Sequence, residues 1–115
     1  MVHKTLGNGF QELIYQRALE IELTREGVLF AREKEMDIFY RNILIGTRRV
    51  DFFVQGNIMV ELKALTKLED VHIAQALNYC EAYNMEIGLL LNFGAKSLEF
   101  KRVHNNTFQK NPKIL

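Results

Sequence analysis

Apolar residues recur at three- and four-residue spacing from about residue 10 to Gly27, which predicts an amphipathic helix. The turn signal Gly7-Asn8-Gly9 precedes this helix, and Gly27 suits its C-terminal cap. The periodic face consists of Phe10, Leu13, Ile14, Ala18 and Ile21. An opposite stripe begins with an acid and continues with large residues: Glu12, Tyr15, Leu19 and Leu23. We therefore expect this helix to be apolar on two sides.

The rest of the chain predicts five strands and a second helix. The strands are expected over residues 28–40, 43–54, 58–64, 87–92 and 97–103, where β-branched and aromatic residues gather or alternate with polar ones. Helical periodicity returns over about 69–84. The order helix, three strands, helix, two strands predicts an α/β sandwich, in which a mixed sheet with an antiparallel central meander is flanked by helices.

Composition adds limits to this picture. A chain of 115 residues with 48% apolar content fits one domain, expected over residues 1–104, followed by a polar tail at 105–115. The sequence shows no signal-peptide pattern and no apolar run long enough to span a membrane, and its one cysteine, Cys80, reads as a buried core thiol. We expect a cytoplasmic protein. The net charge of +1 predicts only modest, salt-sensitive affinity for nucleic acid.

Candidate chemistry lies on the second and third predicted strands. Strand alternation puts Asp51 opposite the face shared by Val50, Phe52 and Val54, and puts Glu61 and Lys63 opposite the face shared by Ile58, Val60 and Leu62. A three-residue loop at 55–57, with Gly56 or Asn57 in the left-handed conformation, would pair Val54 with Ile58. It would also place Asp51 across from Glu61, with their Cβ atoms about 5 Å apart. A two-residue loop would send the two carboxylates to opposite faces.

Two carboxylates at that spacing repel each other unless a cation lies between them, and Mg²⁺ or Mn²⁺ would supply the charge. Lys63 lies about 7 Å along the strand from Glu61, where it could orient or deprotonate an attacking water or offset charge on a phosphate. Asp51, Glu61 and Lys63 together would form a site for metal-assisted phosphodiester hydrolysis. The alternative is a cross-strand salt-bridge cluster on a solvated sheet face.

The helices and the basic residues offer further candidates. Glu12 is either a third acid near the metal or an exposed first-turn acid that the helix dipole favours. On the second helix, Gln75 shares a face with His72 and Tyr79, and is either a contact to phosphate or metal or plain polar surface. The candidate nucleic-acid contacts are Arg48, Arg49, Lys67 and Tyr79.

Five ordered blocks of the sequence resemble the GxxExxY proteins, a group of PD-(D/E)XK nuclease-like proteins. The first block is Gly9-Phe10-Gln11-Glu12-Leu13-Ile14-Tyr15, and the next two are Arg49-Val50-Asp51-Phe52 and Val60-Glu61-Leu62-Lys63-Ala64. The last two are His72-x-x-Gln75-x-x-Asn78-Tyr79, and Gly88 to Gly94 followed by Leu98-x-x-Lys101-Arg102. The resemblance covers roughly residues 2 to 104. Asn8 stands where relatives usually have proline, and Val50-Asp51 stands for the leading Pro-Asp of the superfamily motif.

The resemblance implies a restriction-endonuclease-like fold and a divalent-metal nuclease site. Asp51 and Glu61 would be metal ligands, Lys63 the catalytic lysine, Glu12 the first-helix acid and Gln75 an active-site glutamine. The implied function is an Mg²⁺- or Mn²⁺-dependent nuclease acting on nucleic acid, with DNA as the expected substrate. The low net charge and small size suggest that a homodimer or a partner protein supplies more binding surface. The alternative is a non-catalytic nucleic-acid- or protein-binding module on the same scaffold.

Overall fold

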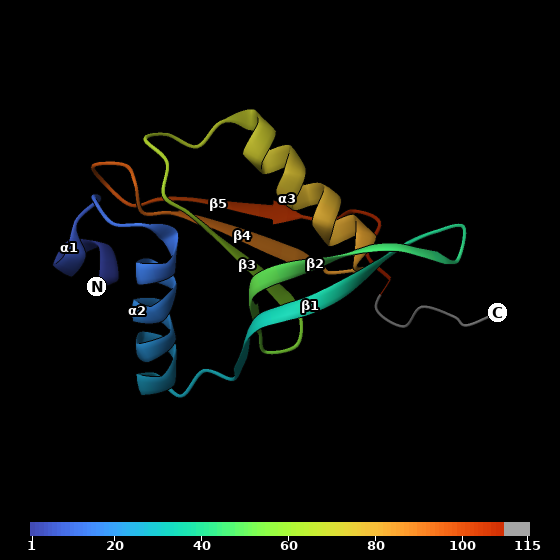
Figure 1. The fold of residues 1–115 in the computed structure, drawn as a ribbon, viewed down its shortest axis with the longest axis horizontal. Helices are drawn as coiled ribbons and strands as arrows, with labels where there is room; N and C mark the ends of the chain where they lie inside the picture. The colour runs from blue at the N-terminus through green and yellow to red at the C-terminus, as the bar shows by residue number, and fades with distance from the viewer. Residues whose placement is uncertain (110–115) are drawn as a thin grey trace.

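The computed structural model describes residues 1–109 and shows a five-stranded sheet with helices on both faces (Figure 1). The helices are α1 (Val2–Leu6), α2 (Glu12–Arg25) and α3 (Asp70–Ala82). The strands are β1 (Phe30–Tyr40), β2 (Ile43–Val54), β3 (Ile58–Lys63), β4 (Ile87–Asn92) and β5 (Glu99–His104). The predicted α/β sandwich is therefore confirmed, and α1 is an element that the sequence analysis did not predict.

The sheet has the strand order β1-β2-β3-β4-β5, with β3 in the middle. The first three strands form an antiparallel meander, β3 pairs with β4 in parallel, and β5 returns antiparallel to β4. A parallel neighbour requires a crossover connection, and α3 supplies it over one face of the sheet. The sheet is therefore mixed, as predicted.

The turn between β2 and β3 is the predicted three-residue loop, because Val54 pairs with Ile58. Gln55 and Gly56 have positive φ angles of 52° and 77°. Gly56 therefore adopts the left-handed conformation as expected, and Gln55 adopts it as well. This loop fixes the register that brings Asp51 toward β3.

Two apolar clusters occupy the two faces of the sheet. Under α3, the buried cluster contains Val50, Met59, Ala76, Cys80, Met85, Leu90 and Val103, which confirms the buried thiol. On the α2 side, the buried cluster contains Tyr15, Phe52, Val60, Leu62 and Phe93. Because α2 and α3 cover opposite faces, the central part of the sheet is buried on both sides, whereas the distal end of the β1–β2 hairpin is exposed.

The predicted face shared by Val50, Phe52 and Val54 is wrong. Val50 packs under α3, whereas Phe52 and Val54 pack on the α2 side. The regular alternation is interrupted at Asp51, which has no ladder partner in β1. Glu33, which would be that partner, has a φ of 54°, and this left-handed residue locally disrupts the pairing.

The face of α2 that packs on the sheet is the stripe that begins with Glu12. Tyr15 is fully buried, and its ring stacks on Phe93 with centroids 4.7 Å apart. Its hydroxyl donates to the carbonyl of Gly7 at 2.6 Å and accepts from the backbone N–H of Phe10 at 3.1 Å. The face predicted from periodicity is the outer one, with Phe10, Leu13, Ile14 and Ile21 exposed. A buried aromatic ring with a satisfied hydroxyl decided the orientation of the helix.

Two further observations concern the limits of the chain. Asn105 is buried and donates hydrogen bonds to the carbonyls of Cys80 and Met85, so packed structure continues past residue 104. Residues 110–115 of the predicted tail lie outside the described residues. None of the described helices is both long and apolar enough to cross a membrane.

Candidate active site

The site forms where β2 and β3 separate. Their ladder runs from Val54–Ile58 to Phe52–Val60 and then stops, so Asp51 and Glu61 are not the next ladder pair that the sequence analysis expected. The Asp51 carboxylate accepts instead from the backbone N–H of Leu62, at 2.8 Å from Oδ2. A side-chain carboxylate thus takes a hydrogen bond from the backbone of β3. This contact fixes Asp51 beside the central strand.

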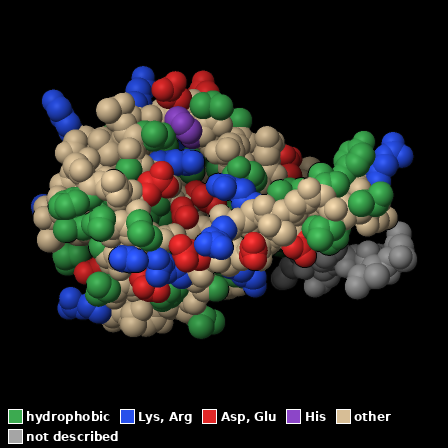
Figure 2. Space-filling view, in the orientation of Figure 1, with side chains coloured by type: hydrophobic (Ala, Val, Ile, Leu, Met, Phe, Trp, Pro, Cys, Tyr) green, Lys and Arg blue, Asp and Glu red, His purple; other side chains and the backbone are tan. Residues whose placement is uncertain are grey.

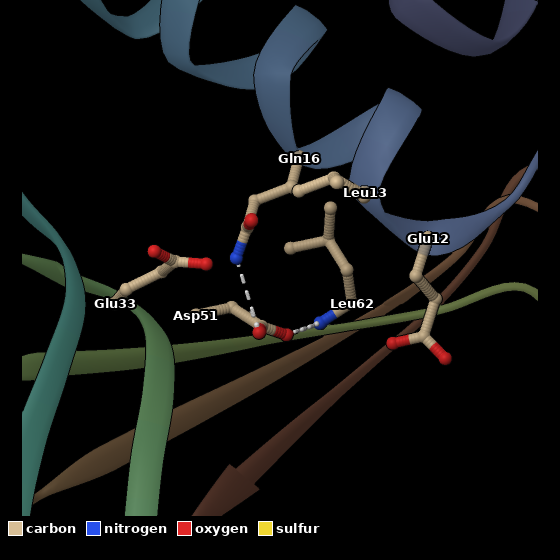
Figure 3. Close-up of a pocket in the computed structure, with 6 residues that line it drawn as sticks. All are labelled: Glu12, Leu13, Gln16, Glu33, Asp51 and Leu62. Carbon is tan, nitrogen blue, oxygen red and sulfur yellow. Dashed lines mark hydrogen bonds between the residues drawn. The ribbon is translucent and has the colours of Figure 1, made fainter.

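A second contact to Asp51 comes from α2 (Figure 3). Gln16, only 5% exposed, donates from Nε2 to Asp51 Oδ1 at 3.2 Å. Its other amide atom, Oε1, accepts from Arg32 at 3.1 Å, and Arg32 lies 3.5 Å from Glu20. Both Asp51 oxygens are therefore oriented. Gln16 was not predicted as a site residue from the sequence, although its position four residues after Glu12 places it on the same helix face.

Glu61 is buried, with 4% of its surface exposed. Its neighbours in β3, Val60 and Leu62, pack toward α2, so Glu61 points to the α3 face. Arg48 lies 3.4 Å from Glu61 Oε2, and Oε1 has no hydrogen-bond partner among the described residues. Burial, reinforced by the negative charge of Asp51, raises the pKa of Glu61 from 4.5 to about 7, and the positive charge of Arg48 opposes that rise.

Arg48 and Tyr79 were predicted to contact nucleic acid, but they contact each other. The guanidinium lies over the Tyr79 ring, 4.4 Å from its centroid, while it also pairs with Glu61. Arg49 and Lys67 are exposed. A contact of any of these side chains with nucleic acid stays a prediction.

Lys63 and Glu12 complete the charged surroundings. Alternation puts Lys63 on the face of Glu61, and no acid among the described residues forms an ion pair with it. Burial raises the pKa of Glu12, and the charge of Lys63 opposes this rise, so these two groups lie within electrostatic range of each other. In Figure 3, Glu12 lies on the first turn of α2, beyond Leu62 from Asp51.

A pocket of about 130 Å³ opens between α2 and the sheet at this point. Its lining consists of Glu12, Leu13, Gln16, Glu33, Asp51 and Leu62. Glu61, Lys63 and Gln75 are not part of that lining. Glu61 and Lys63 are on the opposite face of β3 from Leu62, and Gln75 is exposed on α3, one turn before Tyr79. The charges of Asp51 and Lys63 nevertheless act on both Glu61 and Glu12, so these four groups lie near one another, whereas Gln75 is exposed on the α3 surface.

The sequence matches a family profile described as the PD-(D/E)XK nuclease superfamily over residues 1–103. The chain belongs to this superfamily. The match covers both halves of the candidate site, including Asp51 on β2 and the Glu61-Leu62-Lys63 segment on β3. Members of the superfamily are generally dependent on divalent metals.

Comparison with solved structures supports the fold. The chain is similar to the structure titled "Crystal structure of SSO0001", with a TM-score of 0.63 and 18% sequence identity. The similarity covers 80% of this chain and 49% of that one, so this chain spans about half of its structural neighbour. No curated protein matches the chain.

The chemistry of the site fits a divalent cation bound by few protein ligands. Among residues 1–109, no three His, Cys, Asp or Glu side chains lie close enough together to hold a metal ion. Asp51 and Glu61 nevertheless supply two carboxylates, and the buried Oε1 of Glu61 has no partner in this part of the chain. Mg²⁺ typically takes one or two carboxylates and keeps several waters, so this pair suffices. Glu12 as a third ligand stays a prediction.

Proposed function

We propose that this superfamily member is a nuclease that uses Mg²⁺ or Mn²⁺ to hydrolyse phosphodiester bonds in DNA. The observation that carries the proposal is the arrangement of three side chains. Asp51 is oriented by two hydrogen bonds, and Glu61 is buried beside it. Among residues 1–109, one oxygen of Glu61 has no hydrogen-bond partner and Lys63 forms no ion pair. Separately, none of these features identifies an activity; together they make a phosphate-cleaving site.

Each residue has a distinct role in this proposal. Asp51 and Glu61 bind the cation, and Gln16 keeps the Asp51 carboxylate in its orientation. When bound, the cation polarises the phosphate and stabilises developing negative charge. Lys63 orients the attacking water or offsets charge on the scissile phosphate. Glu12 and Gln75 are proposed to act at the edge of the site, where Glu12 lines the pocket.

The substrate proposal rests on the surroundings of the site. Figure 2 shows acidic side chains in the middle of one face with Lys and Arg side chains around them. Such a ring favours a polyanion, although the net charge of +1 limits affinity. We therefore propose that a second copy or a partner protein adds binding surface. A cytoplasmic location remains a prediction from the sequence.

The test is metal-dependent cleavage of labelled linear, single-stranded and branched DNA. Wild type is expected to cut with Mg²⁺ or Mn²⁺ and to stop in EDTA. Asp51→Asn and Lys63→Ala should be inactive, whereas Lys96→Ala, which removes an exposed lysine outside the site, should cut normally. Equal cleavage by wild type and Asp51→Asn would refute the proposed site.

One observation favours a second candidate, a non-catalytic binding module. The Arg48 guanidinium already lies 3.4 Å from Glu61, so it partly balances the carboxylate charge without any metal. Titration calorimetry with Mn²⁺ separates the two candidates. A nuclease should bind Mn²⁺ in a manner that requires Asp51 and Glu61, whereas a module whose acid is neutralised by Arg48 should bind none.

A further inference from the structure

The outer half of the β1–β2 hairpin extends beyond the rest of the sheet. β3 pairs with β2 only at residues 52–54, so the distal part of the hairpin is a two-stranded ribbon. Figure 1 shows this ribbon projecting from the body of the protein. The ribbon closes in a tight turn at Arg41 and Asn42, both with positive φ. We call residues 37–47 the hairpin tip.

Large apolar side chains cover both faces of the hairpin tip. Five of them are between 53% and 65% exposed: Phe39, Tyr40, Ile43, Leu44 and Ile45. Phe39 pairs with Leu44, and Tyr40 pairs with Ile43, so alternation puts these two pairs on opposite faces. Hydrophobic side chains are visible at the end of the projection in Figure 2. A ribbon that is apolar on both faces cannot bury both against its own domain.

We propose that the hairpin tip is a self-association surface, through which two copies of this chain form a symmetric dimer. The charges within the tip favour a second copy over nucleic acid. Residues 37–47 contain one acid, Asp37, and one base, Arg41, so the tip has no net charge to attract phosphates. A two-fold axis between two tips can place Asp37 of each copy near Arg41 of the other, which makes the surface complementary to itself.

The available area is sufficient for a dimer in which both faces of each tip are covered. A large side chain presents roughly 200 Å² when fully accessible. Five side chains exposed to about three fifths therefore present on the order of 600 Å² in each copy, divided between the two faces of the ribbon, and a pair that covers both faces of each tip buries up to about 1,200 Å². That total reaches the lower limit of specific protein interfaces and exceeds most crystal contacts.

The outer edge of β1 favours a closed pair over an open chain of copies. Between Arg32 and Asp37 this edge strand carries alternating charges, through Glu33, Lys34 and Glu35. Charged side chains and the irregularity at Glu33 discourage strand addition along an edge. Strand addition along β1 is thereby disfavoured, which leaves the apolar tip of this hairpin as the contact between the two copies.

The first experiment is sedimentation velocity from about 5 to about 200 µM protein. Wild type should shift from monomer to dimer as concentration rises. The double variant Phe39→Ser/Ile43→Ser removes one side chain from each face and should stay monomeric with an unchanged circular dichroism spectrum. Ile21→Ser/Leu29→Ser is the matched control, because those residues are 60% and 76% exposed outside the tip, and it should dimerise as wild type does.

Charge exchange tests the predicted symmetry. Asp37→Arg and Arg41→Asp should each weaken the dimer, and the two changes combined should restore it. Wild type that stays monomeric at every concentration, or a dimer that survives Phe39→Ser/Ile43→Ser, would overturn the proposal. So would a monomer that binds neutral lipid vesicles or DNA through the tip. These outcomes are separate from the nuclease proposal, because none of the variants alters Asp51, Glu61 or Lys63.

Discussion

Replacing Glu61 with glutamine should stabilise the metal-free protein at alkaline pH. Glu61 is buried, lies beside the negative charge of Asp51, and has one oxygen without a partner in residues 1–109. The Glu61→Gln side chain has the same shape but never ionises. The charge that makes the site suitable for a cation is therefore the charge that destabilises the empty site.

The magnitude follows from the pKa of Glu61. Burial and the charge of Asp51 raise this pKa from 4.5 to about 7, so the folded state binds the proton more tightly than the unfolded state. The stability contributed by Glu61 is complete below about pH 4.5 and is lost as the pH rises to about 7. The pKa difference between the folded and unfolded states is about 2.5. Relative to acidic pH, ionisation of Glu61 therefore lowers the free energy of unfolding by roughly 3 kcal/mol at pH 8 and by about 1 kcal/mol at pH 5. The favourable charge of Arg48 is already contained in that pKa.

The assay is urea denaturation of wild type and Glu61→Gln in EDTA at pH 5 and pH 8. We expect the free energy of unfolding of the variant to exceed that of wild type by up to about 3 kcal/mol at pH 8, with most of the difference gone at pH 5. Adding Mn²⁺ should stabilise wild type alone, because only its carboxylate binds the ion. An equal difference at both pH values, or a less stable variant at pH 8, would show that Glu61 is not a buried, destabilising acid.

Two further substitutions test the surroundings of the site and the packing beneath it. Gln16→Ala removes the donor to Asp51 Oδ1 and should weaken Mn²⁺ binding by about 10- to 100-fold in calorimetry, whereas unchanged affinity would deny it a positioning role. Gly88→Ala would place a Cβ 2.7 Å from the Sγ of Cys80, so urea denaturation should show a loss of about 1–3 kcal/mol. Gly9→Ala is the control, since its Cβ would meet nothing within 4 Å and stability should barely change.

Local patterns in the sequence were sufficient to predict the positions of most helices and strands. The β-branched and aromatic runs located β2 and β4 at their observed bounds, and the helical period located α3 to within two residues at either end. The three-residue loop after Val54 set the β2–β3 register, because loop length alone decides which residues pair. The motif residues Asp51, Glu61 and Lys63 were thereby brought to one region of two neighbouring strands.

The sequence could not decide features that depend on partners distant in the chain. Helix α2 has two apolar stripes, and only the stacking of Tyr15 on Phe93 selected the one that faces the sheet. The Val50 side chain lies on the α3 face because the pairing of β2 with β1 is interrupted at Glu33. The alternation of residues along a strand does not predict such an irregularity.

The same distinction holds at the site. The sequence by itself identified two acids and a lysine as candidates from residue type and approximate strand position, although the expected ladder pairing of Asp51 with Glu61 was wrong. Only the tertiary structure decided that Gln16 orients Asp51 and that Arg48 pairs with Glu61, since these contacts join α2 to β2 and β2 to β3 across the fold. Spacing along one chain segment fixes what a strand presents, whereas the charge and hydrogen bonding of a buried carboxylate are set by whatever packs against it.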